Sequence, residues 1–177
     1  MYKKLLTASI LGTIAIGSSA IAYNFPLKNN ENSAQKQPEL IISQNAELER
    51  LENLVHQQIN DYRKSKGLPP LTIDNAIRKQ CRIHSQNMAN KTVRFGHDGF
   101  KNRLAEIRKT INNYRGGAEN VAYNQGYKDP DVVAVKGWLK SSGHKANIQG
   151  KYNLTGIGVA KNAKGEYYFT QIFILTK

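Results

Sequence analysis

The stretch Gly-Trp-Leu-Lys-Ser-Ser-Gly-His-Lys-Ala-Asn-Ile, residues 137–148, carries the strongest signal in the chain. Two shorter motifs precede it, Phe-Gly-His at 95–97 and Gly-Ala-Glu-Asn-Val at 117–121. Each of the three segments combines small or amide residues with one side chain of chemical interest, either a histidine or a glutamate. Polar sites are commonly assembled from such distant segments on a rigid scaffold. The three segments therefore mark where a polar site would lie, although spacing alone does not show that they meet.

His97, Glu119 and His144 suit two kinds of chemistry. The histidines could ligate zinc, with Glu119 as a third ligand or as a general base. The same trio could perform acid–base work without a metal. A purely structural interpretation stays open beside these: His97 caps a helix, Glu119 pairs with a lysine or arginine, and His144 lies in a loop. Asn120 and Ser141 complete the predicted cleft.

Two of these residues have further interpretations. Asn120, like Asn147, could tie a loop to backbone groups. Ser141 could suggest a nucleophile, but the pattern of a nucleophile elbow is missing around it. We therefore do not expect Ser141 to be a nucleophile.

The N-terminal segments are predicted to lie outside the folded domain. Residues 1–22 have a basic start, an apolar core over 5–16 and an Ala-Ile-Ala cleavage pattern at 20–22, which is typical of a signal peptide. An uncleaved membrane anchor is the alternative. Residues 23–44 are polar and predict a disordered linker. The domain then spans residues 45–177.

The charge of the chain narrows the class of partner. The 177 residues carry a formal net charge of +13, which favours nucleic acid or an anionic polymer of the cell envelope as partner. Export favours the envelope and a secreted or extracytoplasmic location. No basic run is interleaved with aromatic residues, so no nucleic acid is expected. Cys81 is the only cysteine, so it forms no intramolecular disulfide. We expect Cys81 to be a small, buried apolar side chain.

Periodicity and end signals predict the elements. Gly67 ends a first helix, Asp74 begins a second, and Asp129-Pro130 begins a fourth. Trp138 belongs to the core, and His84 points inward. The predicted helices are 46–66, 75–91, 100–110 and 130–141; the predicted strands are 119–123, 154–160 and 166–175, the last two joined by a turn at 162–165. Helices first and antiparallel strands last indicate a layered α+β domain.

Several motifs in order resemble those of the CAP superfamily, which comprises cysteine-rich secretory proteins, antigen 5 and pathogenesis-related 1 proteins. The similarity covers about residues 48–175 and is strongest to the bacterial branch with an SCP-like extracellular domain. The segments that carry it are His-Ser-Gln-Asn-Met (84–88), Phe-Gly-His-Asp-Gly-Phe (95–100), Arg103, Ala-Glu-Asn-Val-Ala (118–122), residues 137–148, Thr-Gly-Ile-Gly-Val-Ala (155–160) and Tyr-Phe-Thr-Gln-Ile-Phe (168–173).

The resemblance implies a three-layer α-β-α sandwich with a central antiparallel sheet. It also implies a cleft with two histidines, at His97 and His144, that can bind a divalent metal such as zinc, and a glutamate at Glu119. A second family glutamate would fall just after Trp138, where this chain reads Leu-Lys-Ser and has no acid. The cysteine framework of eukaryotic members is also missing.

Two functions follow as hypotheses. The first is a non-enzymatic exported domain that binds an anionic envelope polymer, or an apolar, lipid-like ligand. The second is a zinc-dependent, peptidase-like hydrolase in which Glu119 activates water. The missing second acid favours the first. Membrane contact is expected only through an uncleaved signal peptide, and the sequence does not indicate an oligomeric state.

Overall fold

Strands from the middle and the end of the chain form one four-stranded sheet in the order β1-β3-β4-β2. The computed structural model describes residues 31–176, and its side chains from Ser43 onward. The strands are β1 (Thr72–Ile73), β2 (Gly116–Gln125), β3 (Leu154–Lys161) and β4 (Glu166–Leu175); the helices are α1 (Glu31–Ser65), α2 (Asn75–Ala89), α3 (Phe100–Arg108), α4 (Pro130–Lys140) and α5 (Ser142–Gln149).

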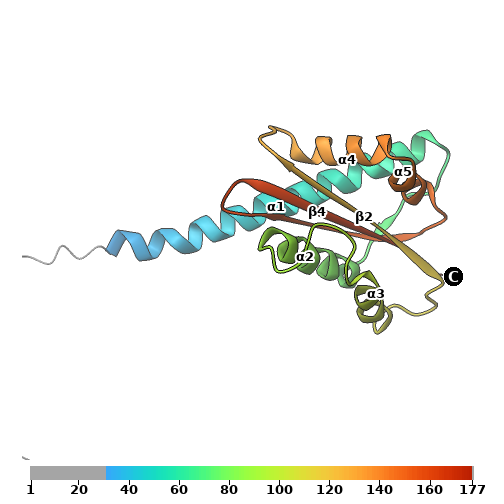
Figure 1. Cartoon of the computed structure of the whole chain (residues 1–177), viewed down its shortest axis with the longest axis horizontal. Coiled ribbons are helices and arrows are strands. Elements are labelled where there is room, and N and C mark those ends of the chain that lie inside the picture. Colours follow the sequence, from blue (N-terminus) through green and yellow to red (C-terminus); the bar gives the residue numbers. More distant parts are fainter. Residues whose placement is uncertain (1–30, 177) are drawn as a thin grey trace, which may run out of the picture.

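Helices cover both faces of the sheet, so the molecule has three layers (Figure 1). Apolar residues of α1, α4 and α5 pack on one face, around Trp138 and Phe169. Apolar residues of α2 and α3 pack on the other, around Cys81 and Ile172. The α-β-α sandwich predicted from the sequence is confirmed.

The central strand β4 supplies both cores because its side chains alternate between the faces. Tyr167, Phe169 and Phe173 join the core under α1 and α4. Ile172 and Ile174 join the core under α2 and α3. β4 pairs antiparallel with β2 over all ten residues of each strand and antiparallel with β3 on its other side. The predicted antiparallel arrangement holds for the three long strands, whereas the two-residue β1 pairs parallel with β3.

Two glycines let α2 lie unusually close to β3. A Cβ on Gly156 would overlap the backbone of Ile77 and Arg78, and a Cβ on Gly158 would overlap that of Cys81 and Arg82. The Cys81 thiol, buried as predicted, donates a hydrogen bond to the carbonyl of Gly156 at 3.2 Å. The glycine-broken pattern of this strand is thus explained by close helix–strand packing.

Most residues predicted to begin or end a helix or to form the turn are found in those positions. The Asp74 carboxylate accepts hydrogen bonds from the backbone N–H groups of Ala76 and Ile77 and so caps α2. Gly67 follows α1 with a left-handed φ of 68°. Gly165 closes the β3–β4 turn with a φ of 76°. Asp129 precedes Pro130 at the start of α4, but its side chain makes no capping hydrogen bond.

The structure differs from the prediction at six elements. α1 begins at Glu31 and not at Ala46, so it overlaps the segment predicted as a disordered linker, and Figure 1 shows its first turns projecting beyond the sheet. β2 is about twice as long as predicted. β1 and α5 were not predicted. α2 and α3 each end two residues early.

The predicted signal peptide, residues 1–22, lies outside the described residues, and the division of the chain into signal peptide, linker and domain stays a prediction. Among residues 31–176, no helix is both long enough and apolar enough to cross a bilayer.

Candidate functional site: a histidine pair beside a buried ion pair

Glu119 lies on β2 beneath α3, and its side chain is only 1 % exposed. Arg103 of α3 binds both of its oxygens: Nε donates to Oε2 at 2.8 Å and Nη2 donates to Oε1 at 2.7 Å. Such a bidentate pair is among the strongest charge-assisted arrangements in proteins. Glu119 therefore acts first as the buried counter-ion of Arg103.

His97 completes the environment of this carboxylate. Its Nδ1 lies 2.9 Å from Oε1 of Glu119. A carboxylate with no proton can only accept, so Nδ1 carries the hydrogen and the neutral ring keeps its lone pair on Nε2. The His97 side chain is 50 % exposed, so this nitrogen can be reached from solvent. The hydrogen bond to Glu119 thus fixes the orientation of the His97 ring, with Nε2 on the side away from the carboxylate.

The loop that carries His97 is anchored at both ends. Nε2 of His84, a buried residue of α2, lies 2.8 Å from the carbonyl oxygen of Gly96. Arg103 Nη1 donates to the carbonyl of Asp98 at 2.8 Å. Burial is the main cause that lowers the pKa of His84, with a smaller contribution from the positive charge of Arg103. His84 points inward as predicted, and its role is to hold this loop.

His144 approaches from the opposite layer, in the first turn of α5. Its ring centre lies 6.5 Å from that of His97, with the two planes at 46°. Burial, and secondarily the charge of His97, lower the pKa of His144, which favours its neutral form. The two histidines and the glutamate predicted from the sequence do come together, at the edge strand β2.

Two asparagines fix α5 against β2. Asn120 Nδ2 donates to the carbonyl of His144 at 3.1 Å. Asn147 Nδ2 lies 2.9 Å from Asn120 Oδ1 and 3.3 Å from the carbonyl of Glu119, and it donates to both. The predicted tie from these amides to backbone groups is confirmed. Asn120 is fully buried, so it supports the histidine pair from inside the protein.

Arg63 of α1 holds the other end of α5. This buried guanidinium donates to the carbonyl oxygens of Ile148 at 2.7 Å and Gly150 at 2.9 Å, and also to those of Pro69 and Tyr152. Burial lowers its pKa from the usual arginine value. The position of His144 therefore depends on a cation that the sequence did not single out.

The remaining predicted residue has a different place. Ser141 joins α4 to α5 and is the N-cap residue of α5, where its side chain makes no capping hydrogen bond. Its membership of the cleft stays a prediction. Arg103 is the missed partner: it belongs to the motif set, but a lone arginine on a short helix gives no sign of which acid it meets.

The histidine pair offers fewer side-chain ligands than the three or four of a typical zinc site. No group of three His, Cys, Asp or Glu side chains in the described part of the chain is placed to hold a metal. His97 and His144 could provide two nitrogen ligands. Zinc–nitrogen bonds are about 2.0–2.1 Å, so the rings must close slightly to share an ion. The carboxylate behind His97 is the usual outer partner of a metal-binding histidine.

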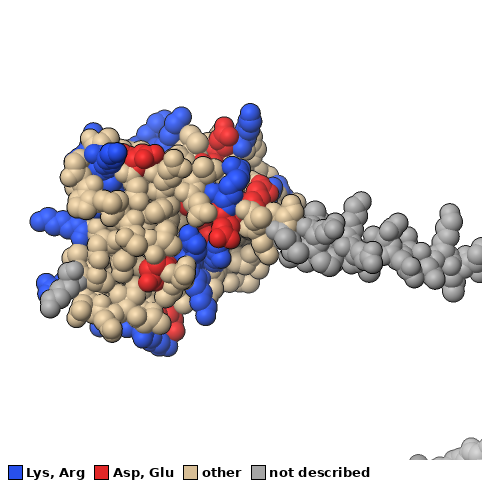
Figure 2. Space-filling view, turned by 180° about the vertical axis from the view of Figure 1, so that it is seen from behind, with Lys and Arg blue, Asp and Glu red and all other residues tan. Residues whose placement is uncertain are grey.

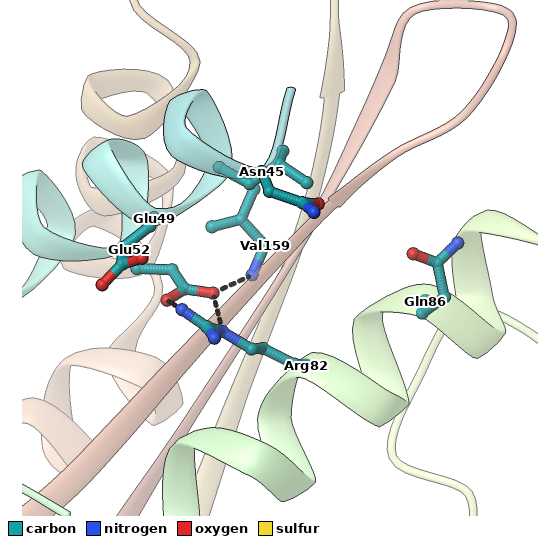
Figure 3. A pocket seen from close by; sticks show the side chains of 7 residues that line it. Asn45, Glu49, Glu52, Arg82, Gln86 and Val159 are labelled. Carbon is teal, nitrogen blue, oxygen red and sulfur yellow. Dashed lines mark hydrogen bonds and ion pairs between the residues drawn. The ribbon is translucent and has the colours of Figure 1, made fainter. Parts of the chain in front are cut away.

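A second acid–base cluster lies between α1, α2 and β3 and has a structural role. Figure 3 shows Glu52 of α1 pointing at Arg82 of α2 and at the backbone of Val159. Arg82 donates to both Glu52 oxygens, at 2.8 and 2.6 Å, and the Val159 N–H donates to Oε1 at 3.3 Å. This N–H lies where β1 no longer covers β3. Glu52 thus satisfies a backbone donor at an otherwise open strand edge.

Three layers around a largely antiparallel sheet, with a histidine pair at the β2 edge, define the class of protein. The model of the cysteine-rich secretory protein family, CAP, matches residues 56–173. The chain belongs to this family, as the motifs had indicated.

Known relatives agree with this assignment. The uncharacterized protein YkwD of Bacillus subtilis is 32 % identical over 153 residues, which are 82 % of this chain and 57 % of that protein. This chain thus spans little more than half the length of that relative.

Among solved structures, an extracellular protein containing an SCP domain from Bacillus anthracis is similar at 29 % identity and a TM-score of 0.55, over 73 % of this chain and 43 % of that one. An outer surface protein of Borrelia burgdorferi shares the fold at 21 % identity and a TM-score of 0.61, over 72 % and 94 % of the two chains.

Proposed function

We propose that this chain is an exported CAP domain that binds an anionic component of the cell envelope and takes a divalent cation between His97 and His144. The carrying observation is the state of Glu119. Its carboxylate receives two hydrogen bonds from Arg103 and one from His97. A carboxylate engaged in this way is a counter-ion and a positioning group. A site with its carboxylate engaged in this way suits binding better than hydrolysis.

The environment of the histidines supports cation binding. Metal ligation requires neutral imidazole, and the lowered pKa of His144 favours that form near neutral pH. Glu119 leaves Nε2 of His97 as the available nitrogen. When bound, a divalent ion supplies a positive charge and open coordination positions to which an anionic group can bind.

Charge and relatives support the envelope as the location of the partner. From Asn45 onward the chain has 22 lysines and arginines against 11 acids. Figure 2 shows basic side chains spread around the outline of one face, with acidic ones among them. The attraction of this face for an anionic partner is therefore spread over many side chains and not concentrated in one patch. By name, one similar protein is an outer surface protein and another is extracellular.

The test is retention of the full-length chain on isolated envelope material at about 20 mM and about 500 mM salt. We expect binding at low salt that is lost at high salt, because exposed charges are screened. The absence of binding at low salt contradicts the proposal. The same protein, incubated with zinc and either casein or peptidoglycan peptides, should leave them intact; cleavage lost in Glu119→Gln would establish the hydrolase alternative.

A further inference from the structure

An exposed aromatic strip lies beside the histidine pair. Among the described residues, four large apolar side chains are exposed, and two of them, Phe95 (54 %) and Tyr123 (45 %), contact one another with ring centres 6.3 Å apart. Tyr123 also packs on the buried Tyr168, with centres 5.2 Å apart. We call Phe95, Tyr123 and Tyr168 the aromatic strip. Exposed contiguous apolar surface of this kind marks an interaction site more often than scattered single residues do.

The strip continues the candidate site along the sheet. Phe95 stands two residues before His97 in the same loop. Tyr123 follows Glu119 by four residues on β2 and therefore shares its face of the sheet, about 13 Å further along the strand. A ligand that lies along β2 can thus touch the histidine pair and the strip together.

The rings of the strip are held in place. Tyr123 and Tyr168 both donate their hydroxyl hydrogens to Glu166, at 3.3 and 3.2 Å. Phe95 precedes Gly96, whose carbonyl is anchored by His84. A ring already fixed loses little conformational freedom when a ligand stacks on it. The rings of the aromatic strip are therefore preorganised for stacking. An exposed apolar side chain without such contacts would first have to be ordered by the ligand.

Basic residues border the same place. A hollow of about 420 Å³ is lined by Met88, Val93, Phe95 and Tyr168 together with Lys91 and Arg94. Lys91 and Arg94 are exposed. Flat aromatic faces beside cations match a ligand with apolar ring faces and negative charges. Sugar rings have apolar C–H faces, and acidic sugars add carboxylate or phosphate groups.

We infer that the aromatic strip, with Lys91 and Arg94, is a binding site for an acidic glycan. The sugar rings stack on Phe95 and Tyr123, and the two cations meet the anionic groups of the glycan. The inference rests on the proposed function, since it names the class of envelope component that the domain holds.

The experiment measures binding of the full-length chain to polygalacturonate, an acidic glycan, by calorimetry. Dextran tests the need for charge, poly-glutamate tests the need for sugar, and a single-stranded oligonucleotide tests nucleic acid. We expect polygalacturonate to bind at least tenfold tighter than the other three. Equal binding of poly-glutamate, or tighter binding of the oligonucleotide, overturns the inference.

Variants assign the binding to the strip. Phe95→Ala and Tyr123→Ala should each weaken polygalacturonate binding at least tenfold, and Tyr123→Phe, which keeps the ring, should retain most of it. Tyr127→Ala is the matched control, because Tyr127 is an exposed aromatic outside the strip. Arg94→Ala should weaken binding and reduce its salt dependence, whereas Lys136→Ala on α4 should not. Wild-type binding by both aromatic variants overturns the inference.

The outcome is separable from that of the proposed function. Envelope retention that survives in Tyr123→Ala and Phe95→Ala would leave the proposed function standing and remove the glycan site. The absence of envelope retention by the wild-type chain at low salt would remove both.

Discussion

At the scale of single residues, the ion pair between Arg103 and Glu119 dominates the site. Both side chains are almost completely buried. Arg103→Ala would leave a buried carboxylate without its bidentate partner, which typically costs about 3–5 kcal/mol of the free energy of unfolding. Urea denaturation followed by circular dichroism measures this change.

The control for this prediction is Lys101→Ala, an exposed position on the same helix, which should change the free energy of unfolding by about 0.5 kcal/mol or less. Adding Glu119→Gln to Arg103→Ala should recover part of the loss, because the unpaired charge is then gone. A loss for Arg103→Ala no larger than that of the control would show that the pair is not a main support of the site.

The environments of the buried His84 and the half-buried His144 predict a dependence of stability on pH. The pKa of His84 and that of His144 both lie below the ordinary value of 6.5, chiefly because of burial. The unfolded chain therefore binds protons first as the pH falls. The contribution of these two histidines to the free energy of unfolding should be complete above pH 6.5. It should decrease as the pH falls from 6.5 through their pKa values in the folded protein.

Denaturation at about pH 7.5 and about pH 5.5 tests this dependence above the range in which carboxylates titrate. His84→Gln and His144→Gln should each reduce the difference in stability between the two pH values. An unchanged difference in the double variant would contradict the assignment.

The motifs and the family resemblance predicted which residues of the site meet, and the residue types predicted the amide ties of Asn120 and Asn147, but not the two arginines that support the site. His97, Glu119 and His144 stand in recognisable motifs, and all three converge. The supports of the site are Arg103 and Arg63. Arg63 meets four backbone carbonyl groups, and carbonyl groups leave no trace in the sequence. A buried arginine is therefore indistinguishable, before folding, from the many exposed cations of this basic chain.

At the scale of elements, the contact between α2 and β3 depends on a missing side chain. Gly158→Ala would place a Cβ into the backbone of α2. Overpacking of this kind usually costs about 1–3 kcal/mol, and here backbone must move. Gly137→Ala on the exposed side of α4 meets no atom and should instead stabilise the helix by about 0.5–1 kcal/mol. Thermal unfolding of both variants measures the contrast, and equal effects would contradict the close packing.

Trp138 is the main link between α4 and β2. Its side chain is 1 % exposed, and its Nε1 donates to the carbonyl of Val121 at 2.9 Å. Trp138→Ala removes this packing and leaves a buried carbonyl without a partner, so we expect a loss of about 3–5 kcal/mol. Denaturation with urea is the measurement. A melting temperature close to that of the wild type would show that α4 does not dock through this residue.

The long elements could be predicted because they repeat a pattern, and the short ones could not. α1, α2 and α4 have apolar faces at helical spacing, and β4 alternates. α5 has eight residues with a single buried apolar side chain, Ile148, and a glycine near its start. α5 is held by Arg63 and Asn120 from other elements, and by its own Asn147, which donates back to β2. Its helical form is therefore not predicted by any local periodicity.

At the scale of the whole molecule, the two helical layers meet at the edge strand β2. Arg103 and His97 approach Glu119 from one side of the sheet, and His144 approaches from the other with α5. The histidine pair therefore bridges the two layers. A ligand that binds both histidines should stabilise the packing of both layers at once, because it binds only the folded arrangement.

Calorimetric titration of the full-length chain with zinc at about pH 7.5 tests the central claim most directly, with His97→Ala, His144→Ala and the control His56→Gln beside it. His56 lies outside the pair and contacts the carbonyl of Leu71. We predict micromolar binding of one ion per chain in the wild type and the control, lost in both variants of the pair. No binding to the wild type, or binding that persists without His97 and His144, would contradict the account.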